Sequence, residues 1–178
     1  MNAHGQLTSA AARSITAEMN KKGYDVYFDH DKAGEFVGTT AVSSEEKLSR
    51  ENEISQLDIA VVERKFARAI ALIEIEETTD NPKKLIGDIF AVLMGNSIHL
   101  PRRKKVEVGK WTSLIIIGKG AGHEVRNEHI LKMANNAKSA LGTKNSTIGN
   151  IVIKSLSANE DMEKILMKII DKAVQISA

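Results

Sequence analysis

The chain has 178 residues, of which 42% are hydrophobic and 27% charged, a composition typical of one globular domain with a single sizeable core. No apolar run approaches the roughly 18 residues that a membrane-spanning helix needs, and the first residues lack the basic-then-apolar pattern of a secretory signal. The absence of cysteine excludes disulfides, thiolate metal sites and cysteine nucleophiles, and it suits a reducing compartment. We therefore expect one cytoplasmic domain covering residues 1–178, with no membrane partner.

Charge is unevenly distributed along the chain, although the formal net charge is only +2. Residues 24–79 contain 6 Lys/Arg and 13 Asp/Glu, a net charge of −7, whereas residues 80–150 contain 12 Lys/Arg and 5 Asp/Glu, a net charge of +7. An acidic segment followed by a basic one fits a protein that binds cations at one place and a polyanion at another. A solvated surface of mixed sign would give the same counts, because distance along the sequence does not say which residues share a face.

The first half of the chain predicts one helix followed by three strands. The helix should begin at Thr8 or Ser9 and end before Gly23, a residue that readily adopts the left-handed conformation of a C-cap. The predicted elements are a helix at 8–22, a strand at 24–29, a loop at 30–53 with a short helical turn around 45–49, and strands at 57–62 and 67–76.

The second half predicts alternating helices and strands. Asn81-Pro82 is typical of a helix start, because Asn caps free amides and Pro at the first position loses no hydrogen bond. That helix should end at Gly95. The remaining elements are a basic turn at 102–105, a strand at 113–118, a helix at 127–141, a strand at 148–155 and a helix at 159–176. The order α-β-β-β-α-β-α-β-α predicts a mixed sheet with helices on its faces, an α/β fold.

Three carboxylates interrupt the two apolar strands at 57–62 and 67–76. Because side chains alternate along a strand, Glu74 and Glu76 should project from one face about 6–7 Å apart, and the hairpin should place Asp58 beside them. Carboxylates on a buried sheet are costly unless they are paired or neutralised, and Mg²⁺ is a natural ligand for such oxygen atoms. Alternatively, the two glutamates lie on an exposed face and pair across the hairpin with basic residues, namely Arg64, Lys65 or Arg68.

This pattern resembles the PD-(D/E)XK nuclease superfamily, the restriction-endonuclease-like proteins, whose core is a helix, three strands, a helix and a strand. The resemblance covers about residues 8–118 in element order, and its motif is Asp58 followed by Glu74-Ile75-Glu76. Lys-Lys-Gly-Tyr-Asp-Val-Tyr at 21–27 is similar to the helix-to-strand entry of these enzymes. The resemblance implies an αβββαβ core and Mg²⁺ held by Asp58, Glu74 and the backbone carbonyl of Ile75.

The sequence departs from the superfamily pattern at three places. Leu57 stands where the motif has Pro, a change that affects no ligand. Glu76 stands where the motif has Lys, as in a minority of type II restriction endonucleases, and the resemblance then makes Glu76 the general base or the residue that orients water. The glutamate that many members supply from the first helix has only weak counterparts here, Glu18 and Glu53.

Basic residues after the motif are candidates for contacts with DNA phosphates, which position a protein without reading sequence. A lysine of the helix that follows the motif could also supply the positive charge that Glu76 lacks. The candidate DNA-binding residues are Lys83, Lys84, Arg102, Arg103, Lys104, Lys105 and Lys119. Each of these side chains could equally be solvated on a surface loop or helix.

The function expected from these residues and from the resemblance is Mg²⁺-dependent hydrolysis of phosphodiester bonds in double-stranded DNA. The catalytic residues would be Asp58, Glu74 and Glu76, and the enzyme would be a type II restriction endonuclease acting as a homodimer. The alternatives are a structure-selective repair or junction nuclease and a catalytically inactive nuclease-like domain that binds DNA or a protein. A nucleotide-binding α/β protein that uses the glycine-rich turn at 118–123 is a third, unrelated reading.

Overall fold

The structure is a computed structural model that describes residues 6–28, 40–45, 47–76, 82–95, 97–100, 104–119, 124–145, 148–156 and 161–177. These residues form four helices and two β-sheets, an open α/β arrangement rather than a barrel. The helices are α1 (Gln6–Lys21), α2 (Pro82–Met94), α3 (Glu124–Asn145) and α4 (Met162–Ser177). No described helix combines the length and apolar character needed to cross a membrane.

The larger sheet, sheet A, has five strands in the order β1-β4-β5-β8-β9. They are β1 (Tyr24–Phe28), β4 (Ile59–Glu63), β5 (Arg68–Glu76), β8 (Ser113–Lys119) and β9 (Asn150–Leu156). Strands β1, β4 and β5 pair antiparallel, whereas β8 pairs parallel to β5 and β9 parallel to β8. The central strand β5 is buried along nearly its whole length, as expected for a strand covered on both faces.

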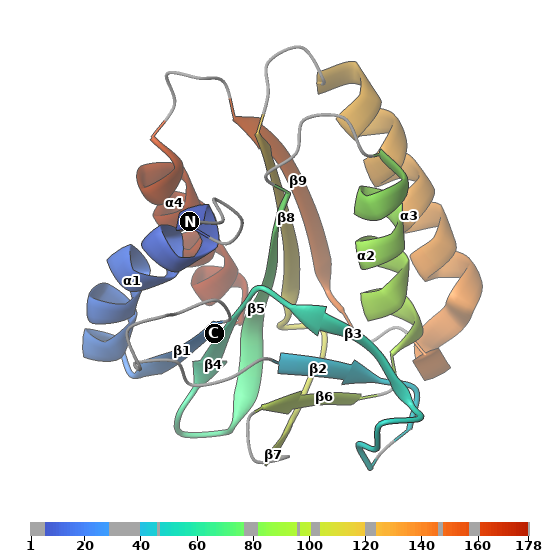
Figure 1. The fold of residues 1–178 in the computed structure, drawn as a ribbon, viewed down its shortest axis with the longest axis horizontal. Helices are drawn as coiled ribbons and strands as arrows, with labels where there is room; N and C mark the ends of the chain where they lie inside the picture. The colour runs from blue at the N-terminus through green and yellow to red at the C-terminus, as the bar shows by residue number, and fades with distance from the viewer. Residues whose placement is uncertain are drawn as a thin grey trace.

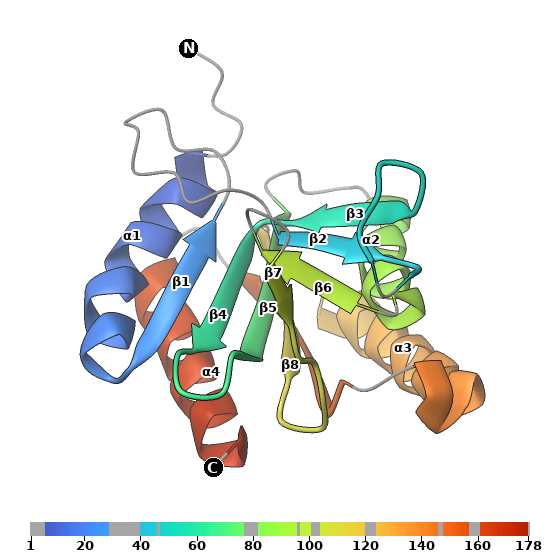
Figure 2. The same ribbon diagram turned by 90° about the horizontal axis from the view of Figure 1, so that it is seen from below.

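Helices cover both faces of sheet A. Figures 1 and 2 show α1 and α4 on one side of the sheet and α2 and α3 on the other. The alternation of β5 divides its side chains between the two layers, so that Leu72 faces the α2 and α3 side and Ile73 faces the α1 and α4 side. The sheet therefore separates two hydrophobic cores.

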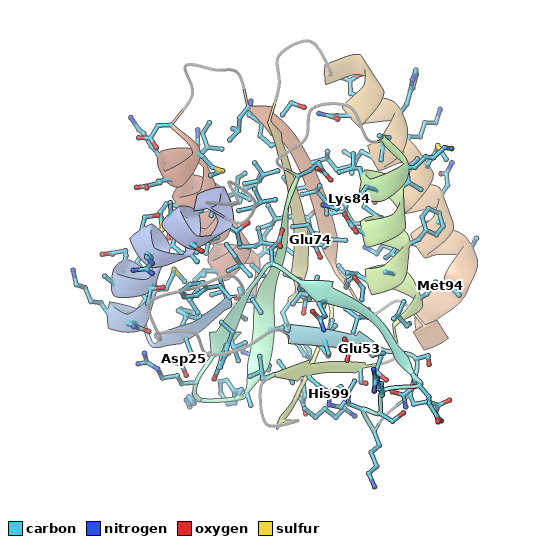
Figure 3. All side chains as sticks on the ribbon, viewed as in Figure 1. Asp25, Glu53, Glu74, Lys84, Met94 and His99 are labelled. Carbon is cyan, nitrogen blue, oxygen red and sulfur yellow. The ribbon has the colours of Figure 1, made fainter. Side chains whose placement is uncertain are left out.

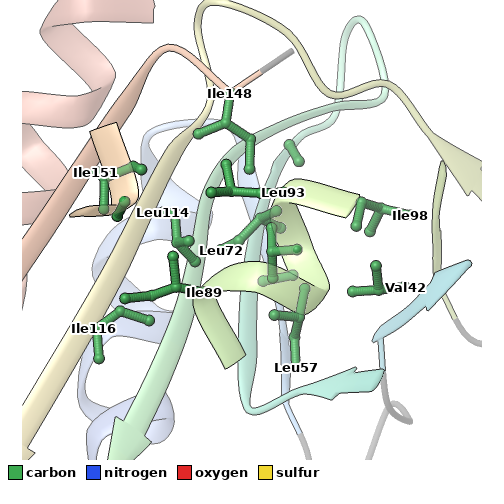
Figure 4. Packing of buried hydrophobic residues seen from close by; sticks show 14 of the residues in the cluster. Val42, Leu57, Leu72, Ile89, Leu93, Ile98, Leu114, Ile116, Ile148 and Ile151 are labelled. Atoms are coloured by element: carbon green, nitrogen blue, oxygen red, sulfur yellow. The ribbon is translucent and has the colours of Figure 1, made fainter. Parts of the chain in front are cut away.

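A second sheet, sheet B, lies beside sheet A on the α2 side (Figure 2). Its antiparallel strands follow the order β3-β2-β6-β7, and they are β2 (Thr40–Ser43), β3 (Glu53–Leu57), β6 (Ser97–Leu100) and β7 (Lys104–Val106). Figure 4 shows how Val42 of β2 and Leu57 of β3 join the core that Leu72, Leu93 and Leu114 form between sheet A and α2. Sheet B thus shares a core with sheet A.

Sheet B corrects four sequence predictions. The predicted single sheet is in fact two, and the predicted loop at 30–53 contains β2 and the start of β3. The described residues at 45–49 are not helical, and the end of the predicted basic turn at 102–105 belongs to β7. The loop prediction failed because β3 is mostly exposed and polar, so that apolar alternation is absent from its sequence.

Most other element predictions are confirmed to within a few residues at each end. Gly23 has a φ of +89°, the left-handed conformation predicted for the C-cap of α1. The amide of Gly95 donates to the carbonyl of Ala91, which closes α2 where the sequence predicted. The strand predicted at 57–62 differs in detail, because Asp58 lies between β3 and β4 instead of inside one strand.

Candidate carboxylate site

The acidic side chains predicted from the sequence lie at the end of β5 that faces α2. Glu74 and Glu76 alternate with Ile73 and Ile75, so both glutamates occupy the same face of β5 as Leu72. Each is 7% exposed. The alternative of two exposed glutamates paired across the hairpin is therefore wrong, and the basic residues proposed as their partners make other contacts.

Those basic residues are held at the opposite end of the hairpin. Arg68 contacts Glu63, with Nη2 and Oε2 2.6 Å apart, and Arg64 contacts Asp25, with Nε and Oδ1 2.6 Å apart. Lys65 lies over the ring of Phe66 at the hairpin turn.

Asp58 is half-buried at the break between β3 and β4, beside the end of β5. Its Oδ2 accepts a hydrogen bond from the amide of Ile75, with a nitrogen–oxygen distance of 2.7 Å. The N–H and C=O of one strand residue point to the same side of the strand, so the carbonyl of Ile75 also points towards the edge where Asp58 lies. β4 begins only at Ile59, which pairs with Ile73 of β5. At Ile75, β5 therefore has no strand partner on that side, and the Asp58 side chain accepts the hydrogen bond instead.

Glu74 is the most strongly perturbed acid of the site. Burial raises the pKa of Glu74 well above the ordinary value of 4.5, and the nearby charges of Asp58 and Asp88 raise it further. Asp58 is close enough to Glu74 for a hydrogen bond between the two carboxyl groups when one of them is protonated. The Oε1 atom of Glu74 is buried and has no hydrogen-bond partner among the residues that the structure describes. A cation bound at this oxygen would therefore supply the partner that Glu74 lacks.

Lys84 brings a cation from α2 to the same place. Its Nζ lies 2.9 Å from Oε2 of Glu76, and Figure 3 shows Lys84 on the side of α2 that faces Glu74 and β5. Burial alone would lower the pKa of Lys84, but the hydrogen bond and charge of Glu76, with the charges of Asp88 and Asp58, outweigh it and raise the pKa above 10.5. Lys84 is therefore an ammonium ion at neutral pH. It occupies the site as a cation, not as a proton acceptor.

Asp88 is a member of the site that the sequence analysis missed. It lies one helical turn after Lys84 on α2, and burial raises its pKa, with Lys84 opposing and Glu76 and Asp58 adding to the increase. The spacing of four residues between Lys84 and Asp88 is the signal that would have placed both on one helix face. We call Asp58, Glu74, Glu76 and Asp88 the carboxylate cluster.

The fit of a divalent cation to this cluster rests on two side chains and one carbonyl. Asp58, the unpartnered oxygen of Glu74 and the carbonyl of Ile75 are hard oxygen donors of the kind that Mg²⁺ prefers. Within the part of the chain that the structure describes, no three acidic or histidine side chains converge as a ready-made metal site. Mg²⁺ sites commonly use only one or two carboxylates and retain several waters, so this smaller donor set fits the ion.

The remaining predicted site residues are scattered. Lys83 is exposed on α2, and Lys105 is exposed on β7 in sheet B. Lys104 begins β7, and Lys119 ends β8 one residue after Gly118, the register partner of Glu76. The other two predicted DNA contacts, Arg102 and Arg103, fall outside the described residues, as does most of the glycine-rich turn at 118–123.

The two glutamates considered as replacements for the first-helix acid both lie away from the cluster. Glu18 is on α1, across sheet A, where Lys21 and Lys22 pair with it. Glu53 is exposed on β3 and accepts a hydrogen bond from Gln56. Neither completes the site.

Comparison with protein-family models, with curated proteins and with solved structures found no significant match to this chain.

Proposed function

We propose that this protein is a Mg²⁺-dependent endodeoxyribonuclease of the PD-(D/E)XK type that acts as a restriction endonuclease on double-stranded DNA. The observation that carries the proposal is the pair of buried Glu74 and half-buried Asp58, with an unpartnered oxygen on Glu74, beside the ammonium of Lys84. Two further features support the proposal. When the strands of sheet B are left out, the elements follow the order α1-β1-β4-β5-α2-β8, and both this order and the pairing of these strands agree with the expected αβββαβ core.

The proposed residue roles follow from charge and position. Asp58, Glu74 and the carbonyl of Ile75 would hold Mg²⁺, which when bound polarises the scissile phosphate and lowers the pKa of a coordinated water. Lys84, permanently protonated beside Glu76, donates a hydrogen bond to a phosphate oxygen and stabilises the charge that develops there. Glu76 orients Lys84 and accepts a proton from the attacking water. In this proposal Lys84 replaces the motif lysine that the strand lacks.

The proposal also covers the oligomeric state, the cellular location and the contacts with DNA. We propose a homodimer, because cutting both strands of a duplex takes one active site for each strand, and a cytoplasmic location. Lys83, Lys105 and Lys119, with the basic residues at 102–104, would contact phosphates on either side of the cleaved bond. A structure-selective repair nuclease would use the same cluster and differ only in the DNA that it accepts.

The test is cleavage of plasmid and genomic DNA with Mg²⁺ and with EDTA. Asp58→Ala and Glu74→Ala should abolish cleavage, and Lys84→Met should slow it by about 10²-fold or more, because a charge aimed at the developing anion is lost. Lys164→Met is the control, an exposed lysine of α4 on the other face of sheet A, and it should change the rate by no more than a few-fold.

The outcome separates the proposal from its rivals. Discrete Mg²⁺-dependent fragments indicate a restriction enzyme, whereas cleavage confined to branched or mismatched DNA indicates a repair or junction nuclease. Intact DNA of every kind in the presence of folded protein and Mg²⁺ would overturn the enzyme. Retained binding to duplex DNA would then leave a nuclease-like binding domain.

A further inference from the structure

A pocket of about 430 Å³ lies between the edge strand β9 and helix α4. This volume is within the range of about 300–1,000 Å³ that small-molecule sites occupy. The pocket opens on the face of sheet A that carries α1 and α4, because Val152 of β9 packs with that layer. The carboxylate cluster is on the other face. The pocket is therefore separate from the site proposed for catalysis.

The walls of the pocket are mostly apolar. Val152 contributes from β9, and Ile165, Ile169 and Ala173 contribute from α4. The three α4 residues are spaced by four positions, so they form one stripe along the helix face that is turned to the sheet. Ile165 and Ile169 remain partly exposed in this stripe. An apolar ligand body would cover surface that the chain itself leaves open to water.

Positive charge surrounds these walls. Lys168 and Lys172 lie one helical turn apart on α4, and Lys154 lies on β9 across from them. Within the described residues, no carboxylate lies at salt-bridge distance from Lys168 or Lys172, whereas Asp171 of α4 pairs with Lys22, the residue after α1. The ammonium groups of Lys168 and Lys172 at one opening favour a negatively charged ligand.

Ser113 provides an independent sign of a missing ligand. Its side chain is 1% exposed and lines the pocket from the first position of β8, and its hydroxyl has no hydrogen-bond partner. Buried hydroxyl groups nearly always have a partner. A ligand oxygen in the pocket would supply one.

We propose that this pocket binds a small amphipathic anion, a molecule with a carboxylate or phosphate head group and a short alkyl chain or a similar apolar group. Lys168 and Lys172 hold the head, and the Ser113 hydroxyl donates a hydrogen bond to one of its oxygens. The apolar body lies against Val152, Ile165 and Ile169.

The test is isothermal titration calorimetry on the full chain in EDTA and without DNA, using octanoate, octyl phosphate, octanol and acetate. Octanoate or octyl phosphate should bind saturably with one site per chain, and the better of the two identifies the head group. Octanol, which lacks the charge, and acetate, which lacks the apolar body, should bind at least about tenfold more weakly.

Variants of α4 then locate the binding site. The double variant Lys168→Met and Lys172→Met should weaken octanoate binding by about tenfold or more, because it removes both charged partners of the head. Lys164→Met is the matched control, an exposed lysine of α4 that is not part of the pocket, and it should leave the affinity unchanged. Ala173→Phe should abolish binding by filling the pocket, with circular dichroism used to confirm that the variant is folded.

Three results would overturn the proposal: no saturable binding of either anion by the folded protein, equal binding of octanol, or an equal loss of affinity in the Lys164 variant. Because the titration contains neither DNA nor Mg²⁺, its result is independent of the nuclease assay. Failure of one proposal therefore leaves the other standing.

Discussion

Replacing Glu74 by glutamine should stabilise the metal-free protein while abolishing the proposed activity. Glutamine has nearly the same shape as glutamate and no charge, so the substitution removes a buried anion that Asp58 and Asp88 repel. Its new amide group can donate a hydrogen bond to Asp58, whose Oδ2 already accepts one from the amide of Ile75. The change keeps the packing and alters only the electrostatics.

The expected magnitude follows from the burial of this carboxylate. Glutamine still buries a polar group at this position but carries no charge, and an unpartnered charged group costs more to bury than a neutral one. Glu74→Gln removes this extra cost, so it should raise the free energy of unfolding in EDTA at pH 8 by an amount on the order of 1–3 kcal/mol. For a domain of this size, each kcal/mol corresponds to an increase of about 2–4 °C in Tm.

The pH dependence gives the prediction a definite sign. The pKa of Glu74 in the folded protein is raised above its value in the unfolded chain, so folding binds the proton more tightly. The wild-type protein should lose stability as pH rises from the ordinary value of 4.5 through the raised pKa. The gain from Glu74→Gln should be small below pH 4.5 and should grow across that interval.

The assay is urea unfolding followed by circular dichroism, with the wild type, Glu74→Gln and a control, Glu18→Gln, measured between pH 4 and pH 8. The control lies on the surface of α1, where its ion pairs contribute little, and it should stay within about 0.5 kcal/mol of the wild type. A Glu74→Gln protein that is less stable than the wild type at pH 8, or a gain that does not change with pH, would refute the reasoning.

Three further outcomes are expected from thermal and urea unfolding. A Mg²⁺ concentration of 100 times the Kd should stabilise the wild type by about 2.7 kcal/mol, and it should have no such effect on Asp58→Asn; equal shifts would contradict metal binding at the cluster. Gly149→Ala should destabilise by about 1–3 kcal/mol, because the added Cβ would lie 1.8 Å from the carbonyl oxygen of Lys110. Its control Gly87→Ala, in open space on α2, should instead stabilise by about 0.5–1 kcal/mol, and a loss there would be unexplained. Leu93→Ala should cost about 2–5 kcal/mol, since Leu93 is fully buried; a cost under 1 kcal/mol would mean that the core described here is loosely packed.

The central elements of the fold were predictable because their sequences are internally consistent. After Arg68, β5 is apolar except for Glu74 and Glu76, and α1 is followed by Gly23, which has the conformation that a C-cap requires. In these elements the apolar composition, the periodicity of the apolar residues and the residues at the element ends all predict the same structure. The two glutamates were predictable as a site for the same reason, since their charge conflicts with a strand that is otherwise apolar.

Sheet B was not predictable from local sequence. β3 has an exposed, polar sequence, and β6 is only four residues long, with Ser97 and His99 alternating with apolar residues. Both strands owe their conformation to pairing with β2 and to the core shared with α2. Such pairing is set by tertiary contacts that no short window of sequence contains.

The position of α2 relative to sheet A could not be predicted from the sequence either, and this position decides which residues belong to the carboxylate cluster. A lysine from the helix after the motif was one alternative for the missing charge, but sequence alone did not separate Lys83 from Lys84. Both lysines are exposed, and what separates them in the structure is the contact of Lys84 with Glu76. Asp88 went unnoticed because it lies outside the motif and only the helix geometry turns it towards the cluster.

One residue separates sheet B from sheet A at Asp58, since β3 ends at Leu57 and β4 begins at Ile59. The proposed metal ligand is therefore also the joint between the two sheets. Excising residues 40–57 to obtain a minimal catalytic core would join Asp58 directly to residue 39 and would remove the strand β3 that fixes its position for the hydrogen bond with Ile75. Engineering that aims to graft a different recognition sheet onto this scaffold should keep the Leu57-Asp58-Ile59 step intact and exchange strands farther from it.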